Sequence, residues 1–286
     1  MDALHIIPTG AALGAEVVGL DLRGPLDAAV QQQLRAAFTA HSVLLCRDQH
    51  LSQADQLRIS RCFGEPIPHP TNTRDRDPDF PAITILSNIK ENGRPVGALG
   101  NDEVHWHIDL VFLHRPGSVS VLYCLETPER GGDTWWASGY AAYEALDERT
   151  QQQLDGVSAL YRHRRPEYNP PELAIHPLVC VHPVSRRKTL YLSPGSAQSV
   201  VGLDEATGTA LLHRLGAHLD QPRFSWRHSW RPGDLVIWDN RCTLHRREGF
   251  DEQARRLMWR TQMVGPPSAV GGENTSLTPI RKEFSI

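Results

Sequence analysis

The stretch LVIWDNRCTLH, residues 235–245, places the short apolar run Leu235 to Trp238 directly before turn-forming residues and a histidine. Comparable runs lie at Val119 to Leu125, Leu178 to His182 and Leu190 to Leu192, and turn residues separate them. Short strands interrupted at regular intervals are typical of a β-sandwich or a jelly roll. The sequence therefore predicts a mainly β fold of one of these two kinds.

Helical patterns flank the predicted strands. Apolar residues at helical spacing predict a helix in the opening third, and Val43 to Cys46 then resembles a buried strand. Ser52 with Asp55 offers a capping-box start for a second helix. Two further helices are expected, around Ala141 to Leu154 and around Asp204 to Leu219.

Residues 66–101 are rich in Pro, Asn, Asp, Arg and Gly, and only the apolar Ala82 to Leu86 interrupts them. This pattern predicts a loop, a strand and a second loop, so we expect residues 66–103 to form an active-site loop or lid. Residues 266–286 are expected to form a C-terminal tail. All-β chains of this length often fold as one unit, so residues 1–286 are predicted to be a single domain.

Composition excludes several classes of protein. The net charge of −3 gives no basic surplus, which argues against a nucleic-acid partner. No stretch approaches the ~20 apolar residues of a membrane span, and the start MDALHIIPTG lacks the features of a signal peptide, so we expect a cytoplasmic protein with no membrane partner. Five cysteines without a CxxC pair argue against a disulfide framework. We also expect a homo-oligomer.

The segment Val104-His105-Trp106-His107-Ile108-Asp109 carries the most specific chemistry. In a strand, a spacing of two would direct His107 and Asp109 to one face, where both can bind one metal ion. His245, which follows a distant apolar strand, can supply a third ligand. Two histidines and one carboxylate form the facial triad of Fe(II) oxygenases, which leaves positions open for a chelating 2-oxo acid and for O2.

Two arginines follow the third predicted ligand within an apolar stretch. Arg256 and Arg260 lie eleven and fifteen residues after His245, and strand alternation gives them the same facing. A buried arginine is costly unless an anion pairs with it, and its planar fork suits a carboxylate. The distal carboxylate of 2-oxoglutarate is the expected partner.

Several blocks of sequence resemble the taurine/2-oxoglutarate dioxygenase family, TauD/TfdA: HWHIDLVF, GGDTWWASGYAAYEAL, WDNRCTLHR and RRLMWR, in this order. The likeness extends from about residue 10 to about residue 265. It implies a mainly β fold with flanking helices, the double-stranded β-helix of jelly-roll, cupin-like proteins. It also implies that His107, Asp109 and His245 bind Fe(II), and that Thr134 and Arg256 bind the distal carboxylate of 2-oxoglutarate.

The resemblance also suggests substrate contacts. Arg260, His69 and Asn101 match residues that meet the substrate in taurine-type enzymes, whereas Asn72 and Ser196 stand where those enzymes carry aromatic side chains. We therefore expect hydroxylation of a small organic anion other than taurine, with release of succinate and CO2. Candidate substrates are a sulfonate, a sulfate ester, an aryloxyalkanoate or another carboxylate.

Three other interpretations stay open. The protein could be a jelly-roll metalloenzyme that uses oxygen without an oxo-acid co-substrate, a catalytically silent protein that binds a small anion, or a zinc-stabilised fold with the same three ligands. His105 is expected to have no metal role, and Asp239 is expected to pair locally with Arg241. The charged run Arg162 to Glu167 is expected to be a solvated loop, or one that closes over the site.

Overall fold

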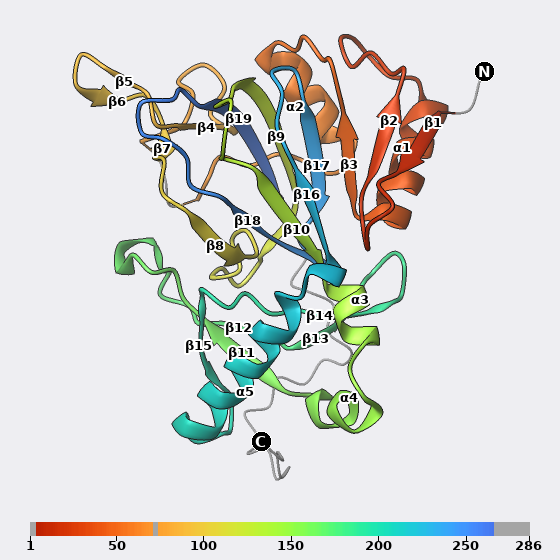
Figure 1. The fold of residues 1–286 in the computed structure, drawn as a ribbon, viewed down its shortest axis with the longest axis vertical. Helices are drawn as coiled ribbons and strands as arrows, with labels where there is room; N and C mark the ends of the chain where they lie inside the picture. The colour runs from red at the N-terminus through yellow and green to blue at the C-terminus, as the bar shows by residue number, and fades with distance from the viewer. Residues whose placement is uncertain (1–3, 71–73, 266–286) are drawn as a thin grey trace.

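Two facing sheets form the centre of the fold in the computed structural model, which describes residues 4–70 and 74–265 (Figure 1). The larger sheet has eight strands, in the order β1 (His5–Pro8), β2 (Ala15–Val18), β3 (Val43–Cys46), β17 (Leu235–Asp239), β9 (Gly117–Glu126), β19 (Leu257–Val264), β4 (Ile83–Ser87) and β7 (Ala98–Leu99). The smaller sheet has four, in the order β16 (Ser225–His228), β10 (Thr134–Ser138), β18 (Thr243–Arg247) and β8 (Val104–His107). Most neighbouring strands are antiparallel, so the predicted jelly-roll architecture is confirmed.

The remaining elements surround these sheets. The helices are α1 (Ala28–His41), α2 (Gln53–Arg61), α3 (Gly139–Glu144), α4 (Glu148–Leu154) and α5 (Glu205–Leu219), with short 3-10 turns η1 (Pro166–Tyr168) and η2 (Pro222–Phe224). The small sheets comprise β5 (Lys90–Glu91) with β6 (Arg94–Pro95), β13 (Val179–Val181) with β14 (Lys188–Leu190), and β11 (Ser158–Tyr161) with β12 (Ala174–Pro177) and β15 (Ala197–Val200). In Figure 1, α3, α4 and α5 gather with β11 to β15 at the end of the molecule away from the N-terminus.

Strand alternation divides the apolar residues between two cores. On β17, Leu235 and Ile237 pack with α1 and α2 on the outer face of the large sheet, whereas Val236 and Trp238 face the small sheet. Period-two alternation produces this division, because successive side chains of a strand point to opposite faces. Between the sheets, Trp136 is fully buried and its ring lies 5.7 Å from that of Trp238. The inner core therefore fixes how the two sheets face each other.

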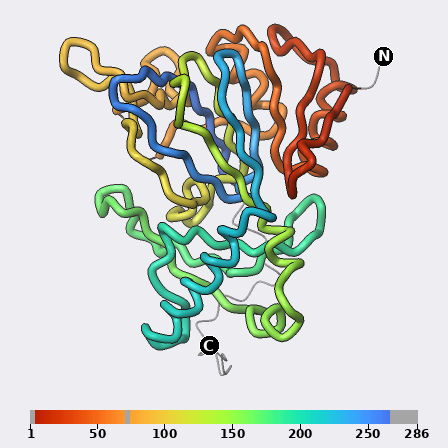
Figure 2. The backbone as a smooth tube through the Cα atoms, viewed as in Figure 1, coloured from red at the N-terminus to blue at the C-terminus, as the bar shows by residue number. Residues whose placement is uncertain are grey.

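Segments far apart in sequence run side by side in the large sheet. Figure 2 shows the C-terminal strand β19 between β9 from the middle of the chain and β4 from its first third, as their pairing requires. In the chain, β17 precedes the predicted third ligand, His245, and β19 follows it. The pairing of both strands with β9 therefore brings the last part of the described chain to the site.

Most predicted elements are confirmed, with two corrections. The capping box at Ser52 and Asp55 is present at the start of α2, and Asp204 caps α5. The predicted helix around Ala141 to Leu154 was wrong as a single element, because α3 ends at Glu144 and Asp147 caps a new helix, α4. The second correction, at Asp109, concerns the candidate metal site.

The predicted lid, residues 66–103, contains the expected central strand β4 together with the short strands β5, β6 and β7. That it acts as a lid stays a prediction. Asn72 and the predicted tail, residues 266–286, lie outside the described residues. Of the helices in the described ranges, none has the length and apolar character needed to cross a bilayer.

Candidate metal centre

Two histidines meet across neighbouring strands of the small sheet. His107 is the last residue of β8 and lies opposite His245 of β18 in the strand register. Their ring centroids are 4.1 Å apart. Antiparallel register therefore places the two imidazoles side by side, although His245 follows His107 by 138 positions in the sequence.

The carboxylate comes from a turn, not from the strand. β8 ends at His107, so the expectation that His107 and Asp109 lie in one strand was wrong. Leu110 adopts a positive φ of 54°, and the Gly117 N–H at the start of β9 donates to the carbonyl of Asp109. A side chain at Gly117 would meet that carbonyl at 2.6 Å, so this close approach requires glycine.

The three side chains converge on one point. Asp109 Oδ1 lies 3.8 Å from His107 Nε2, and Asp109 Oδ2 lies 3.9 Å from His245 Nε2. The three ligand atoms all lie within 4.8 Å of one another. One ion at the ~2.0–2.2 Å of metal–nitrogen and metal–oxygen bonds can bridge such separations. This donor set of two imidazoles and one carboxylate fits Fe(II).

The protonation states of these groups also suit a metal ion. Burial lowers the pKa of His107 and holds the pKa of His245 well below its usual value, so both rings are neutral at pH 7. His107 Nδ1 donates to the carbonyl of His105 at 2.8 Å, which leaves Nε2 as the free lone pair. Burial opposes ionisation of Asp109, but the Arg260 guanidinium and the hydrogen bond from Ser120 lower its pKa, so it is a carboxylate.

A hydrogen-bond chain fixes the Asp109 carboxylate. Ser120 on β9 donates to Asp109 Oδ2 at 2.7 Å, and Asn240 Nδ2 donates to Ser120 Oγ at 2.9 Å. Asn240 Oδ1 accepts from the Asp109 N–H and from Trp238 Nε1. Sequence reasoning did not single out Ser120 or Asn240, since only the fold places β9 beside the turn at Asp109.

Replacing Ser120 with alanine is expected to weaken Mn(II) binding by ~10–100-fold, because partners that orient a ligand contribute this much to metal affinity. Isothermal titration of the metal-free protein with Mn(II) measures the change. Ser118→Ala is the matched control on the same strand, since Ser118 donates to the carbonyl of Met263 and not to Asp109. Equal Mn(II) affinity in both variants would contradict the prediction.

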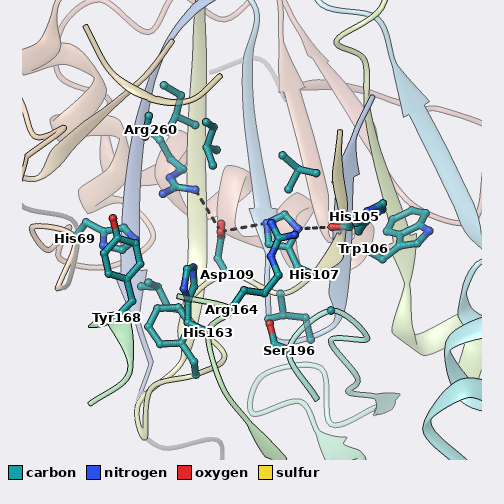
Figure 3. A pocket seen from close by; sticks show the side chains of 18 residues that line it. His69, His105, Trp106, His107, Asp109, His163, Arg164, Tyr168, Ser196 and Arg260 are labelled. Atoms are coloured by element: carbon teal, nitrogen blue, oxygen red, sulfur yellow. Dashed lines mark hydrogen bonds and ion pairs between the residues drawn. The ribbon is translucent and has the colours of Figure 1, made fainter. Parts of the chain in front are cut away.

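A cavity of about 210 Å³ opens beside His107 and Asp109 (Figure 3). The Arg260 side chain points toward Asp109, with Nη1 3.4 Å from Asp109 Oδ1. Burial, followed by the charge of Arg260, lowers the pKa of His69 to about 3, so this wall of the cavity holds a neutral imidazole. Other lining residues include Phe112, His163, Arg164, Tyr168 and Ser196. The run Arg162 to Glu167 thus contributes His163 and Arg164 to the cavity.

Two predicted co-substrate residues lie deeper in the structure. Thr134 is buried on β10, and its Oγ1 accepts from Trp230 Nε1 at 2.9 Å. Arg256, only 2% exposed, directly precedes β19, and the buried Met258 lies between it and Arg260 on the same face of the chain. In the described residues, no carboxylate lies within ion-pair distance of Arg256, and its Nε atom has no hydrogen-bond partner. A buried cation without an anion is costly, so this position fits an anionic ligand.

Neither Asn101 nor His105 belongs to the three converging side chains, although His105 lines the cavity. Asn101 donates to the carbonyl of Phe250, and the Asn101 carbonyl accepts from the Phe250 N–H, so Asn101 joins two loops and is not among the lining residues. Its role as a substrate contact stays a prediction. The side chain of His105 is exposed, 3.8 Å from Glu103, while its carbonyl holds His107.

A second group of possible ligands, His182, Asp239 and Cys242, is fully buried. Arg241 binds both oxygens of Asp239, at 2.8 and 2.6 Å, which confirms the predicted local pair. His182 also donates to Asp239 at 3.0 Å. Because these donors already occupy the carboxylate, the group suits a structural network better than a metal ion.

Comparison with known proteins agrees with this geometry. The model of the family described as "Taurine catabolism dioxygenase TauD, TfdA family" matches residues 5–262. The chain is 30% identical to the (S)-phenoxypropionate/alpha-ketoglutarate-dioxygenase of Sphingobium herbicidovorans, covering 93% of this chain and 97% of that protein. It is 29% identical to an alpha-ketoglutarate-dependent sulfate ester dioxygenase of Pseudomonas putida, covering 96% and 94%.

A solved structure shows the same architecture. The crystal structure of AAD-2 in complex with Mn(II) and N-oxalylglycine superposes with a TM-score of 0.80 at 28% identity, covering 94% of this chain and 100% of that chain. The two chains therefore share their fold over nearly the full length of both.

Proposed function

Because the chain belongs to the TauD/TfdA family, whose members are Fe(II)- and 2-oxoglutarate-dependent dioxygenases, we propose that His107, Asp109 and His245 hold its ferrous ion. The protein is a non-haem iron dioxygenase that uses 2-oxoglutarate and O2, hydroxylates a small organic substrate, and releases succinate and CO2. The assignment of the ligands rests on three donor atoms, two from residues 107–109 and one from the distant His245, which all lie within 4.8 Å of one another.

The chain's own residues bind and orient the reactants. When bound, the ferrous ion supplies the oxygen chemistry, at the positions that three protein ligands leave open. Arg256 and Thr134 are proposed to bind the distal carboxylate of 2-oxoglutarate. The guanidinium supplies a positive charge and N–H donors, and the hydroxyl supplies an O–H donor. Since Thr134 Oγ1 accepts from Trp230, its own proton is free to point toward the co-substrate.

The substrate is proposed to be a small organic anion. Arg260 lines the cavity with its guanidinium beside the metal site, and Arg164 adds a second cation to the wall. His69 is neutral and can offer a hydrogen bond without charge. These groups favour a sulfonate, a sulfate ester, an aryloxyalkanoate or another carboxylate, and the names of the two relatives fall within these classes.

Arg260→Ala is expected to raise the KM for the anionic substrate by ~10–150-fold, the effect of losing a hydrogen bond to a charged group. The affinity for 2-oxoglutarate should change little. Succinate release at varied substrate concentrations gives KM, and titration calorimetry gives the affinity for 2-oxoglutarate. A variant with altered 2-oxoglutarate affinity and an unchanged substrate KM would contradict this role. Arg260→Lys, which keeps the charge beside Asp109, tests whether the charge alone suffices.

An anaerobic titration tests the proposed ligands and co-substrate site together. Addition of Fe(II) and 2-oxoglutarate should produce the weak visible charge-transfer absorption of the ferrous complex with the 2-oxo acid. A silent anion-binding protein or a zinc-stabilised fold would produce none. A screen of sulfonates, sulfate esters, aryloxyalkanoates and simple carboxylates for succinate release then identifies the substrate class.

We further propose that residues 1–286 act as a single catalytic domain, since strands from the first and last thirds of the described chain share one sheet. The homo-oligomeric state and the cytoplasmic location remain predictions.

A further inference from the structure

Arg247 lies on the inner face of the small sheet, two residues after His245 on β18. The strand register places it directly opposite Thr134 of β10. Side chains of directly opposed residues on one face lie ~5 Å apart at their Cβ atoms. Arg247 is only 6% exposed, so a long cationic side chain is buried next to a residue proposed to bind the co-substrate.

Arg247 also lies close enough to Arg256 for their charges to interact. Burial, and after it the positive charge of Arg247, lowers the pKa of Arg256 to about 9. In the described part of the chain, neither guanidinium has a carboxylate within ion-pair distance. The Asp102 charge acts on Arg247 only from beyond ion-pair distance. Two buried cations that repel each other with no closer counter-charge are unfavourable, and an anion between them would reduce the cost.

Unpaired donors near Thr134 also indicate that a hydrogen-bond acceptor is missing. The Nε atoms of both Arg247 and Arg256 are buried and have no partner among the described residues. The hydroxyl of Thr134 accepts from Trp230, which leaves its proton to donate. A carboxylate offers about four lone-pair sites on its two oxygens, so one carboxylate can satisfy all three donors.

We infer that Arg247 is a second cation for the distal carboxylate of 2-oxoglutarate, which two guanidinium groups and the Thr134 hydroxyl then hold together. The inference rests on the proposed function, because it takes 2-oxoglutarate as the ligand of Arg256. It adds a residue that the family resemblance did not indicate. The consequence is strong preference for a 2-oxo acid that carries a second carboxylate.

Arg247 has a structural task as well. Its two Nη atoms donate to the carbonyls of Gly100 and Asp102, in the segment that leads into β8. A purely structural role would affect every 2-oxo acid equally, whether or not the acid has a distal carboxylate. The test therefore compares 2-oxoglutarate with 2-oxobutyrate, which has the same 2-oxo acid group and lacks the second carboxylate.

The experiment measures the affinity of the Mn(II)-loaded protein for each acid by titration calorimetry. Arg247→Gln is expected to weaken 2-oxoglutarate binding by at least ~10-fold, the loss of one hydrogen bond to a charged group, and to leave 2-oxobutyrate binding unchanged. Arg246→Gln is the matched control, because Arg246 points to the other face of β18, over the rings of Trp106 and Trp135. It should leave both affinities unchanged.

Equal weakening of both acids by Arg247→Gln, or no weakening of either, would overturn the inference and leave the proposed function intact. Wild-type protein that binds neither acid would overturn the proposed function itself. If Arg247→Gln does not fold, Arg247→Lys keeps a buried cation that can still reach the loop carbonyls. The loss of the planar fork should then lower the ratio of 2-oxoglutarate to 2-oxobutyrate affinity, and an unchanged ratio would overturn the inference.

Discussion

Asp109→Asn is expected to reduce succinate formation by more than ~100-fold, beyond the effect of losing a partner that only orients a ligand. The substitution keeps the size of the side chain and removes its charge. A carboxylate is the one anionic member of the proposed ligand set, and its oxygens lie 3.8 and 3.9 Å from the two histidine nitrogens. Mn(II) affinity should fall together with activity, because both depend on the proposed bond between Asp109 and the metal ion.

Titration with Mn(II) and an assay of succinate release measure these two losses in parallel. Asp251→Asn is the control, since Asp251 is exposed in the loop after β18, and among the described residues its side chain accepts a hydrogen bond only from the nearby Gln253 N–H. Full activity and full Mn(II) affinity in Asp109→Asn would rule out Asp109 as a ligand. Loss of activity with unchanged Mn(II) affinity would place Asp109 in substrate binding through Arg260.

The sequence predicted the elements better than it predicted the contacts between them. Short-range rules identified β3, β9 and β17 from apolar runs, and the Ser52 capping box from residues three apart. The break between α3 and α4 was missed, although Asp147 is a typical N-cap, because helix-forming residues stand on both sides of it. The cap therefore determined a boundary that helix propensity alone did not show.

At the candidate site, too, the sequence predicted the residues better than the contacts between them. Residue types and the family resemblance indicated His107, Asp109 and His245, and the structure brings all three together. The correct prediction rested partly on a wrong reason, because Asp109 projects from a turn after β8 and not from the strand. Neither spacing nor composition could reveal Ser120 or Arg247. Ser120 meets Asp109, eleven residues earlier, only because the chain turns back before β9, and Arg247 meets Thr134 through the pairing of strands more than a hundred residues apart.

The cavity wall adds a segment that the sequence left ambiguous. The charged run Arg162 to Glu167 could have been a solvated loop, and its Arg165 is indeed exposed. The ring of His163, however, packs 5.0 Å from Phe112 and 4.8 Å from Tyr168, and all three line the cavity. Aromatic packing of this kind anchors the segment against the site. The segment is therefore part of the cavity wall and not only a solvated loop; that it closes over the substrate stays a prediction.

Arg256→Gln is expected to weaken 2-oxoglutarate binding by ~30-fold to several thousand-fold, because removal of one partner from a buried, hydrogen-bonded charge pair costs ~2–5 kcal/mol. Titration of the Mn(II)-loaded variant measures the affinity, and succinate release at saturating 2-oxoglutarate measures the residual turnover. Arg255→Gln is the matched control, since Arg255 is exposed and paired with Glu126 at the surface. It should leave the affinity unchanged.

Arg256→Gln is expected to weaken co-substrate binding without lowering the stability of the fold. Burial disfavours the charged form of Arg256 and, with Arg247, lowers its pKa to about 9, so the cation opposes folding at neutral pH when no anion is bound. The free energy of unfolding of Arg256→Gln without 2-oxoglutarate should therefore equal or exceed that of the wild type, as urea unfolding can measure. A large loss of stability, with 2-oxoglutarate affinity preserved, would show that Arg256 supports the fold and does not bind the co-substrate.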